Sequence, residues 1–168
     1  QRSPLPVLDL RAALFAAKAQ QTVYWPTDSH WNAEGLTVAS AAILARLGEL
    51  GVPAGQRDEA AWMKNEYVAR EGDCIGLLTM RGRWPLEPVS QLRLTFPPDL
   101  RAVPTPLSDF PVWKTVGPWA VPLAFERTSG VGRAVMLCDS FFRVGGQPGD
   151  VNSQSPLILN FQRFVSLW

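Results

Sequence analysis

Residues 134–140, AVMLCDS, decide the fold class of this chain. An unbroken apolar run of this kind is typical of a central parallel strand that is covered on both faces, and the polar pair Asp139-Ser140 follows where the strand should end. A helix is expected over 154–164 and a second strand over 163–168. Strand, helix and strand in this order predict a βαβ unit with a right-handed crossover, and therefore an α/β fold.

The spacing of apolar residues predicts two helices nearer the N-terminus. The first covers 9–20 and the second 33–50, where Asn32 is the expected N-cap because its side-chain oxygen can accept a free backbone N–H of the first turn. Further elements are expected as a strand over 22–25, a short helix over 74–80 and a strand over 92–96, whereas 56–70 fits either a helix or a strand. Residues 97–122 hold seven of the fifteen prolines, which predicts an extended loop.

Composition excludes several classes of protein. The chain has 168 residues, 46% of them hydrophobic, which fits one domain with a sizeable core. A net charge of +1 gives no broad attraction for nucleic acid. One histidine and two cysteines are too few for a disulfide framework or the usual zinc site, and no apolar run approaches the roughly 20 residues that span a bilayer. We expect no metal and no cofactor.

Two polar motifs lie where predicted strands end, which is where ligands bind in open α/β sheets. Asp28 and His30 follow the first strand, and Ser140 follows the 134–138 strand. A serine hydroxyl needs a neighbouring base to become a nucleophile, and a carboxylate can orient an imidazole for that task. Asp28 and His30 are two residues apart, so in an extended segment their side chains point to the same side and can hydrogen-bond.

Structural interpretations compete with this chemistry. A lone histidine near a helix start is more often structural, Asp28 can simply cap the second helix, and Asp139-Ser140 can form a turn that ends a strand. The catalytic interpretation is as good as these only because all three residue types fall at predicted strand ends. Trp31 is a candidate for shaping the site and Arg143 for holding an anionic group, although Arg143 also fits a surface ion pair.

The same motifs resemble a known family. Residues 27–32, TDSHWN, resemble the Thr-Asp-Thr-His-Trp signature of the SGNH-hydrolase-like domain in alginate O-acetyltransferases of the AlgX and AlgJ type. Asp139-Ser140-Phe141 resembles that family's Gly-Asp-Ser-Phe or Gly-Thr-Ser block, with Cys138 where a glycine often stands. The order Asp, His, Ser is distinctive, because ordinary SGNH esterases carry the serine first. The resemblance extends to further landmarks at 7–10, 72–73, 140–143 and 164–168.

The resemblance implies a three-layer αβα fold with a mainly parallel sheet over 1–168, incomplete at its N-terminus. By this resemblance Ser140 is the nucleophile, His30 the base and Asp28 the orienting carboxylate. Trp31 and Arg143 stay candidates for binding substrate. Asn65 is a candidate for a second oxyanion donor.

The activity implied is serine-dependent O-acetyl transfer to an exopolysaccharide or cell-envelope carbohydrate, through an acetyl-serine intermediate, in the periplasm or cell envelope. An acetyl donor, a polysaccharide acceptor and a membrane-associated biosynthetic complex are the implied partners. Two alternatives remain. The same triad serves a carbohydrate esterase or deacetylase when water replaces the sugar hydroxyl, and a non-catalytic glycan-binding module would need no triad.

Overall fold

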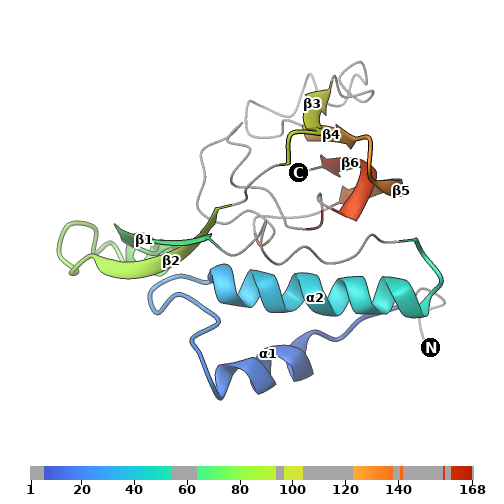
Figure 1. The fold of residues 1–168 in the computed structure, drawn as a ribbon. Helices are drawn as coiled ribbons and strands as arrows, with labels where there is room; N and C mark the ends of the chain where they lie inside the picture. Colours follow the sequence, from blue (N-terminus) through green and yellow to red (C-terminus); the bar gives the residue numbers. More distant parts are fainter. Residues whose placement is uncertain are drawn as a thin grey trace.

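The computed structural model describes residues 6–53, 64–93, 97–103, 123–137, 141, 157 and 160–167. Two helices lie side by side at the base of the molecule, a two-stranded sheet flanks them, and a four-stranded sheet lies above (Figure 1). The elements in chain order are α1 (Arg11–Lys18), α2 (Ala33–Glu49), β1 (Lys64–Arg70), α4 (Asp73–Leu77), β2 (Glu87–Arg93), β3 (Leu100–Val103), β4 (Leu123–Arg127), β5 (Val131–Leu137) and β6 (Phe161–Leu167).

The helices near the N-terminus confirm the sequence prediction. α1 and α2 lie within the ranges expected for them, and Asn32 is the N-cap of α2, since its Oδ1 accepts from the backbone N–H of Gly35 at 2.9 Å. The Asn32 amide also donates to the carbonyl of Thr22 at 2.7 Å, which ties the helix start to the segment before it. Gly51 follows the C-terminus with a φ of 71°, a left-handed conformation that glycine adopts without strain.

One hydrophobic cluster joins the helical part of the molecule to the sheet. Its buried members come from α2 and the loop before it, and from β4 and β6 or the residues beside them: Trp25, Trp31, Ala33, Leu36, Ala39, Phe125, Leu157 and Phe161. Small residues on α2 allow this close packing. A Cβ on Gly35 would lie 2.2 Å from the carbonyl oxygen of Val23 and 2.7 Å from the Cβ of Trp31.

The four-stranded sheet has the order β3-β4-β6-β5 and is mixed. β5 and β6 pair in parallel, as expected for the two strands of the C-terminal unit. The pairs β3-β4 and β4-β6 are antiparallel, so the expectation of a mainly parallel sheet is wrong for the described strands. β4 was not anticipated, and it is the strand that introduces both antiparallel pairs. β3 lies within the proline-rich stretch 97–122, of which 104–122 lie outside the described residues.

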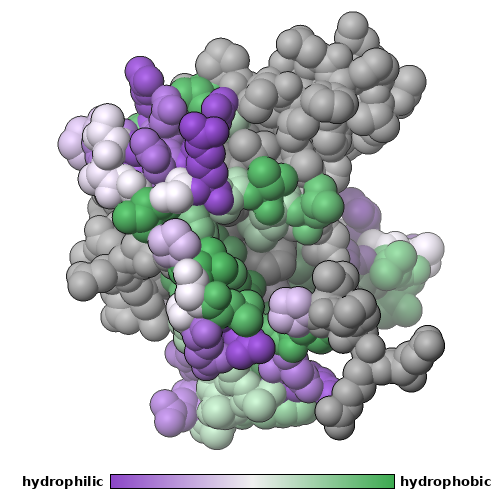
Figure 2. Space-filling model, turned by 90° about the vertical axis from the view of Figure 1, so that its right-hand side faces the viewer, coloured by the Kyte–Doolittle hydropathy of each residue, from purple (hydrophilic) through white to green (hydrophobic). Residues whose placement is uncertain are grey.

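Two expectations for the C-terminal part are also wrong. β5 is an edge strand of the described sheet, not a central one, and its side chains Val135 and Leu137 are 65% and 81% exposed. The face on which β5 lies shows apolar residues gathered beside hydrophilic ones (Figure 2). The helix expected over 154–164 is wrong for 161–164, which belong to β6, while 154–156, 158 and 159 lie outside the described residues. Apolar spacing alone does not separate a short buried helix from a strand, and here sheet pairing decides.

The remaining elements agree only in part with those expected from the sequence. Residues 22–25 make an isolated bridge between Tyr24 and Trp31 where a strand was expected. β1 resolves the ambiguity at 64–70 in favour of a strand, and it pairs antiparallel with β2, which begins earlier than the expected 92–96 strand. Residues 94–96 lie outside the described residues. α4 is the short helix expected near 74–80. Among the helices that the structure describes, none has both the length and the apolarity to cross a bilayer.

The contact at Gly35 yields a stability prediction. Gly35→Ala should lower the free energy of unfolding by about 1–3 kcal/mol, because the added methyl group would overlap the backbone of Val23. Gly48→Ala, in the same helix, is the matched control: nothing lies within 4 Å of its added methyl group. That variant should be more stable by about 0.5–1 kcal/mol, since alanine favours the helix. Urea unfolding of the two variants checks this, and equal stabilities would contradict the packing at Gly35.

Candidate active site

The loop between Val23 and α2 folds back on itself and carries the candidate site. The backbone N–H of Trp25 donates to the carbonyl of His30, and that of Asn32 donates to the carbonyl of Val23 at 3.1 Å. These bonds, with the Tyr24–Trp31 bridge, close a tight turn over 26–29. The turn holds Asp28 and His30 at the start of α2.

Asp28 and His30 form a hydrogen-bonded pair, as their spacing predicted. Asp28 Oδ1 lies 2.6 Å from His30 Nδ1 and also accepts from the His30 backbone N–H at 2.9 Å. The Asp28 side chain has no exposed surface. Because an ionised carboxylate only accepts hydrogen bonds, this contact requires a proton on Nδ1, and in a neutral imidazole the lone pair is then on Nε2. This is the tautomer that a general base needs.

A second segment, far away in the sequence, closes on the same loop. Gly72 and Asp73 begin α4, and the backbone N–H of Asp73 donates to Asp28 Oδ2 at 3.0 Å. The backbone N–H of Cys74 donates to the carbonyl of Thr27 at 3.1 Å. Contact is so close at Gly72 that a Cβ there would lie 2.0 Å from the Thr27 carbonyl oxygen. Only a residue without a side chain lets α4 approach this loop.

The Asp73 carboxylate binds the residue between Asp28 and His30. Its Oδ1 accepts from the backbone N–H of Ser29 at 2.7 Å, and its Oδ2 accepts from the Ser29 hydroxyl at 2.5 Å. Desolvation opposes ionisation, but these hydrogen bonds outweigh it and lower the pKa of Asp73 to about 2. The carboxylate is therefore ionised at neutral pH. It also lies 3.6 Å from His30 Nδ1.

Phe141 brings the C-terminal part of the chain to the same place. Its ring centroid lies 4.9 Å from that of His30 and 5.4 Å from that of Trp31, which it meets edge-on. The indole N–H of Trp31 donates to the Phe141 carbonyl. Phe141 is thus fixed against the imidazole by two ring contacts and one hydrogen bond.

The predicted site residues are described to different extents. Asp28 and His30 are brought together, and Trp31 is buried behind them, only 5% exposed. Ser140 and Arg143 lie outside the described residues, and the backbone of Asn65 lies in β1. Asp73 was not among the predicted site residues, although Gly72-Asp73 is one of the landmarks of the family resemblance. A glycine followed by an acidic residue at a helix start was the available signal.

Asp28, His30 and Asp73 are the group in the described ranges whose ligand atoms, all within 4.8 Å of one another, could hold a metal ion. These atoms are already engaged with one another and with N–H and hydroxyl donors. Asp28 accepts from His30 and Asp73, and Asp73 accepts from Ser29. Hydrogen bonds therefore already satisfy these oxygen and nitrogen atoms.

A family model for the SGNH hydrolase-like domain of the acetyltransferase AlgX matches residues 1–99, which include Asp28, His30 and Asp73. The chain belongs to this family. The match ends before Ser140. The loop that carries Asp28 and His30 and the helix α4 therefore lie inside the matched range, whereas Phe141 lies beyond it. A comparison with curated proteins gave no significant match.

Solved structures similar to this AlgX-type domain include three bacterial proteins. A DHHW family protein from Eubacterium siraeum aligns with a TM-score of 0.62 and 17% identity, over 94% of this chain and 54% of its own, which supports an α/β fold of this type. The O-acetyltransferase domain of Pseudomonas putida AlgJ aligns with a TM-score of 0.46 and 18% identity, over 80% of this chain and 38% of its own. Bacillus cereus PatB1 aligns with a TM-score of 0.49 and 16% identity, over 89% of this chain and 55% of its own. The chain spans about half the length of the first of these proteins.

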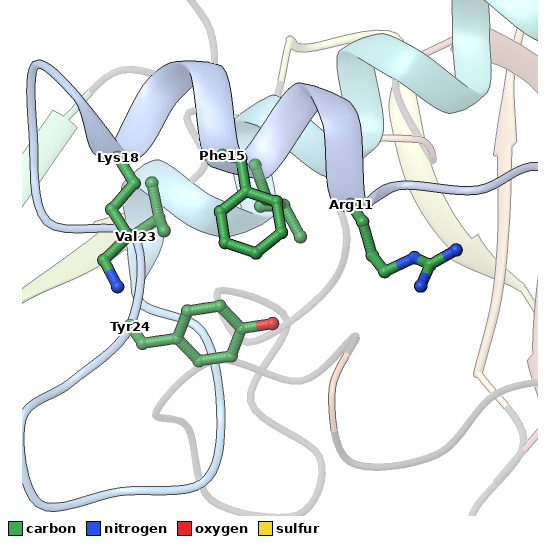
Figure 3. A pocket seen from close by; sticks show the side chains of 6 residues that line it. Arg11, Phe15, Lys18, Val23 and Tyr24 are labelled. Atoms are coloured by element: carbon green, nitrogen blue, oxygen red, sulfur yellow. The ribbon is translucent and has the colours of Figure 1, made fainter.

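A hollow of about 150 Å³ lies away from the site, between α1 and the segment 23–24. Phe15 and Tyr24 face each other across it, with Lys18 and Arg11 at its two ends (Figure 3). None of the residues that line it contributes to the Asp28–His30 pair.

The hydrogen bonds of Asp28 predict a large effect for a small change. In Asp28→Asn one oxygen is replaced by an NH₂ group, which must face either the N–H of Asp73 or the donors of His30. Such a mismatch in a buried site should lower the free energy of unfolding by about 1–3 kcal/mol. Urea unfolding is the measurement. Asp9→Asn is the control, because Asp9 forms an exposed ion pair with Arg11 and its replacement should leave the free energy of unfolding nearly unchanged. Equal effects at both positions would contradict this account of Asp28.

Proposed function

We propose that this chain is the catalytic domain of a serine-dependent O-acetyltransferase that acts on an exopolysaccharide or cell-envelope carbohydrate. The observation that carries the proposal is the 2.6 Å contact between Asp28 Oδ1 and His30 Nδ1, in a ring that also contacts Phe141. Phe141 is bonded directly to Ser140 in the chain. Membership of the AlgX family supports acetyl transfer as the reaction.

In the first half-reaction the Ser140 hydroxyl attacks the carbonyl carbon of the acetyl donor. His30 Nε2 takes the hydroxyl proton as the new C–O bond forms, and Asp28 stabilises the imidazolium. When the tetrahedral intermediate collapses, the bond to the donor breaks and His30 returns the proton to the leaving group. The product is acetyl-Ser140.

In the second half-reaction a sugar hydroxyl takes the place of the leaving group. His30 Nε2 removes its proton while the sugar oxygen attacks the acetyl carbon, and the proton then passes to the Ser140 oxygen as that bond breaks. The acetylated sugar leaves and the serine is regenerated. The same steps with water in place of the sugar would make the protein an esterase.

Two further residues have roles in this proposal. Trp31 is buried and donates to the Phe141 carbonyl, so its role is to hold the segment next to the nucleophile against His30. Arg143, two residues beyond Phe141, is proposed to bind an anionic group of the donor or acceptor. The three-layer αβα architecture over 1–168 belongs to the proposal as well.

The cellular setting follows from the same resemblance. Transfer to an exopolysaccharide places the domain in the periplasm or cell envelope, with an acetyl donor, a polysaccharide acceptor and a membrane-associated biosynthetic complex as partners. Nucleic acid is not a partner in this proposal, since the net charge is only +1.

The nucleophile is tested with a chromogenic acetyl ester. The wild-type protein should release the chromophore and show an acetyl group on the peptide that contains Ser140, detected by mass spectrometry. Ser140→Ala should abolish the adduct and lower turnover by roughly a thousandfold or more. Ser129→Ala is the matched control, because the Ser129 hydroxyl is bound to Asp99 in another part of the fold. If Ser140→Ala retains its activity, the nucleophile is another residue.

The acceptor is tested by adding an oligosaccharide to the same assay. Faster turnover with acetylated sugar as product supports the transferase, whereas hydrolysis that the sugar leaves unchanged indicates an esterase. Binding of the sugar without any ester cleavage would contradict both and indicate a glycan-binding module.

A further inference from the structure

We propose that Asp73 is a positioning residue of this site, a second carboxylate that fixes the Asp28–His30 loop and faces the imidazolium formed when His30 takes a proton. Its catalytic consequence rests on the proposed function, whereas its effect on His30 does not.

The hydrogen bonds of Asp73 run in both directions between α4 and the loop. Its side chain accepts the backbone N–H and the hydroxyl of Ser29, while its own backbone N–H donates to Asp28 Oδ2. Asp28 in turn accepts from His30. One residue therefore holds Ser29 and Asp28, the two residues that precede His30, and a shift of Asp73 would move the carboxylate that orients the ring.

The charge of Asp73 has a separate effect. At 3.6 Å, its Oδ2 is too far from His30 Nδ1 for a good hydrogen bond, but close enough for a charge interaction. The side chain is 36% exposed, so solvent screens part of this interaction. Neutral His30 gains little from it. Protonated His30 is stabilised by Asp28 and Asp73 together, and this is the state that exists while the base holds the substrate proton.

Asp28, whose Oδ1 lies 2.6 Å from Nδ1, is the other carboxylate at this side of His30, and it is kept when Asp73 is replaced. The pKa of Asp73 is held down to about 2, as described above. Cys74, the next residue of α4, has a raised pKa through desolvation and through the Asp73 carboxylate beside it, so its thiol stays neutral. The Ser29 hydroxyl oxygen, 3.5 Å from Nδ1, is uncharged. Removing the charge of Asp73 therefore changes one charge at this face of the ring.

Asp73→Asn removes that charge and keeps the backbone N–H. Its amide oxygen can accept the Ser29 backbone N–H, and its NH₂ group can donate to the Ser29 hydroxyl, which can turn to accept. Asp99→Asn is the matched control: the Asp99 carboxylate likewise accepts the backbone N–H and the hydroxyl of one serine, Ser129, in a cluster that shares no residue with the site. Both aspartates have lowered pKa values with serine hydrogen bonds among the causes. The two variants thus remove the same kind of group from two places.

The first readout is the protonation of His30, followed by NMR. His30 is the single histidine of the sequence, so its ring signals need no assignment. In Asp73→Asn the midpoint of its titration should move to lower pH relative to wild type, and in Asp99→Asn it should not move. Should Asp73→Asn fail to fold, Asp73→Ser serves as a smaller neutral replacement with the same expected direction. A folded variant whose His30 titrates as in wild type overturns the proposal, whether or not the protein is an enzyme.

The second readout is the pH profile of acetyl-ester turnover. The acid limb should shift in Asp73→Asn in the same direction as the NMR midpoint, with kcat lowered more than KM is changed. A residue that served only to stabilise the fold would lower the amount of active protein and leave the profile in place. An unshifted profile beside a shifted NMR midpoint would overturn the catalytic part and the assignment of His30 as the base.

Discussion

Burial of the Asp28 carboxylate is the constraint on which the rest of the site depends. A charged group with no exposed surface must have its oxygens hydrogen-bonded, and the donors here come from two segments 45 residues apart in the sequence. His30 provides two of them from the same turn, and Asp73 provides the third from the start of α4. Formation of the turn and docking of α4 are therefore coupled, since either one alone leaves the buried Asp28 carboxylate without one of its hydrogen-bond donors.

Aromatic packing extends this constraint to the C-terminal part of the chain. Trp31 belongs both to the turn and to the hydrophobic cluster that includes Phe125 and Phe161 of the sheet. Its indole N–H binds the carbonyl of Phe141, whose ring also contacts His30. The Asp28–His30 pair is thus hydrogen-bonded to α4, and its imidazole contacts the ring of Phe141. Trp31 connects Phe141 to the hydrophobic cluster that includes residues of the sheet.

Local patterns in the sequence predicted the local parts of this arrangement. The helices, the Asn32 cap and the Asp28–His30 contact depend on neighbours a few residues apart, and spacing reveals them. Asp73 was missed because its partners are 45 residues away, a relation that a single sequence does not display. The edge position of β5 and the antiparallel neighbours of β6 were missed for a similar reason: apolar runs indicate a strand without naming its partners.

The fit at Gly72 has a mechanical consequence. The backbone at Gly72 packs against the backbone of the loop at Thr27 with no room for a side chain, so α4 cannot move toward this loop unless the loop also moves. The far end of α4 carries two exposed leucines, Leu77 and Leu78. A molecule that bound to these leucines would therefore contact a helix of only five residues. The first residue of this helix, Asp73, is hydrogen-bonded to Asp28, and Asp28 is hydrogen-bonded to the His30 imidazole.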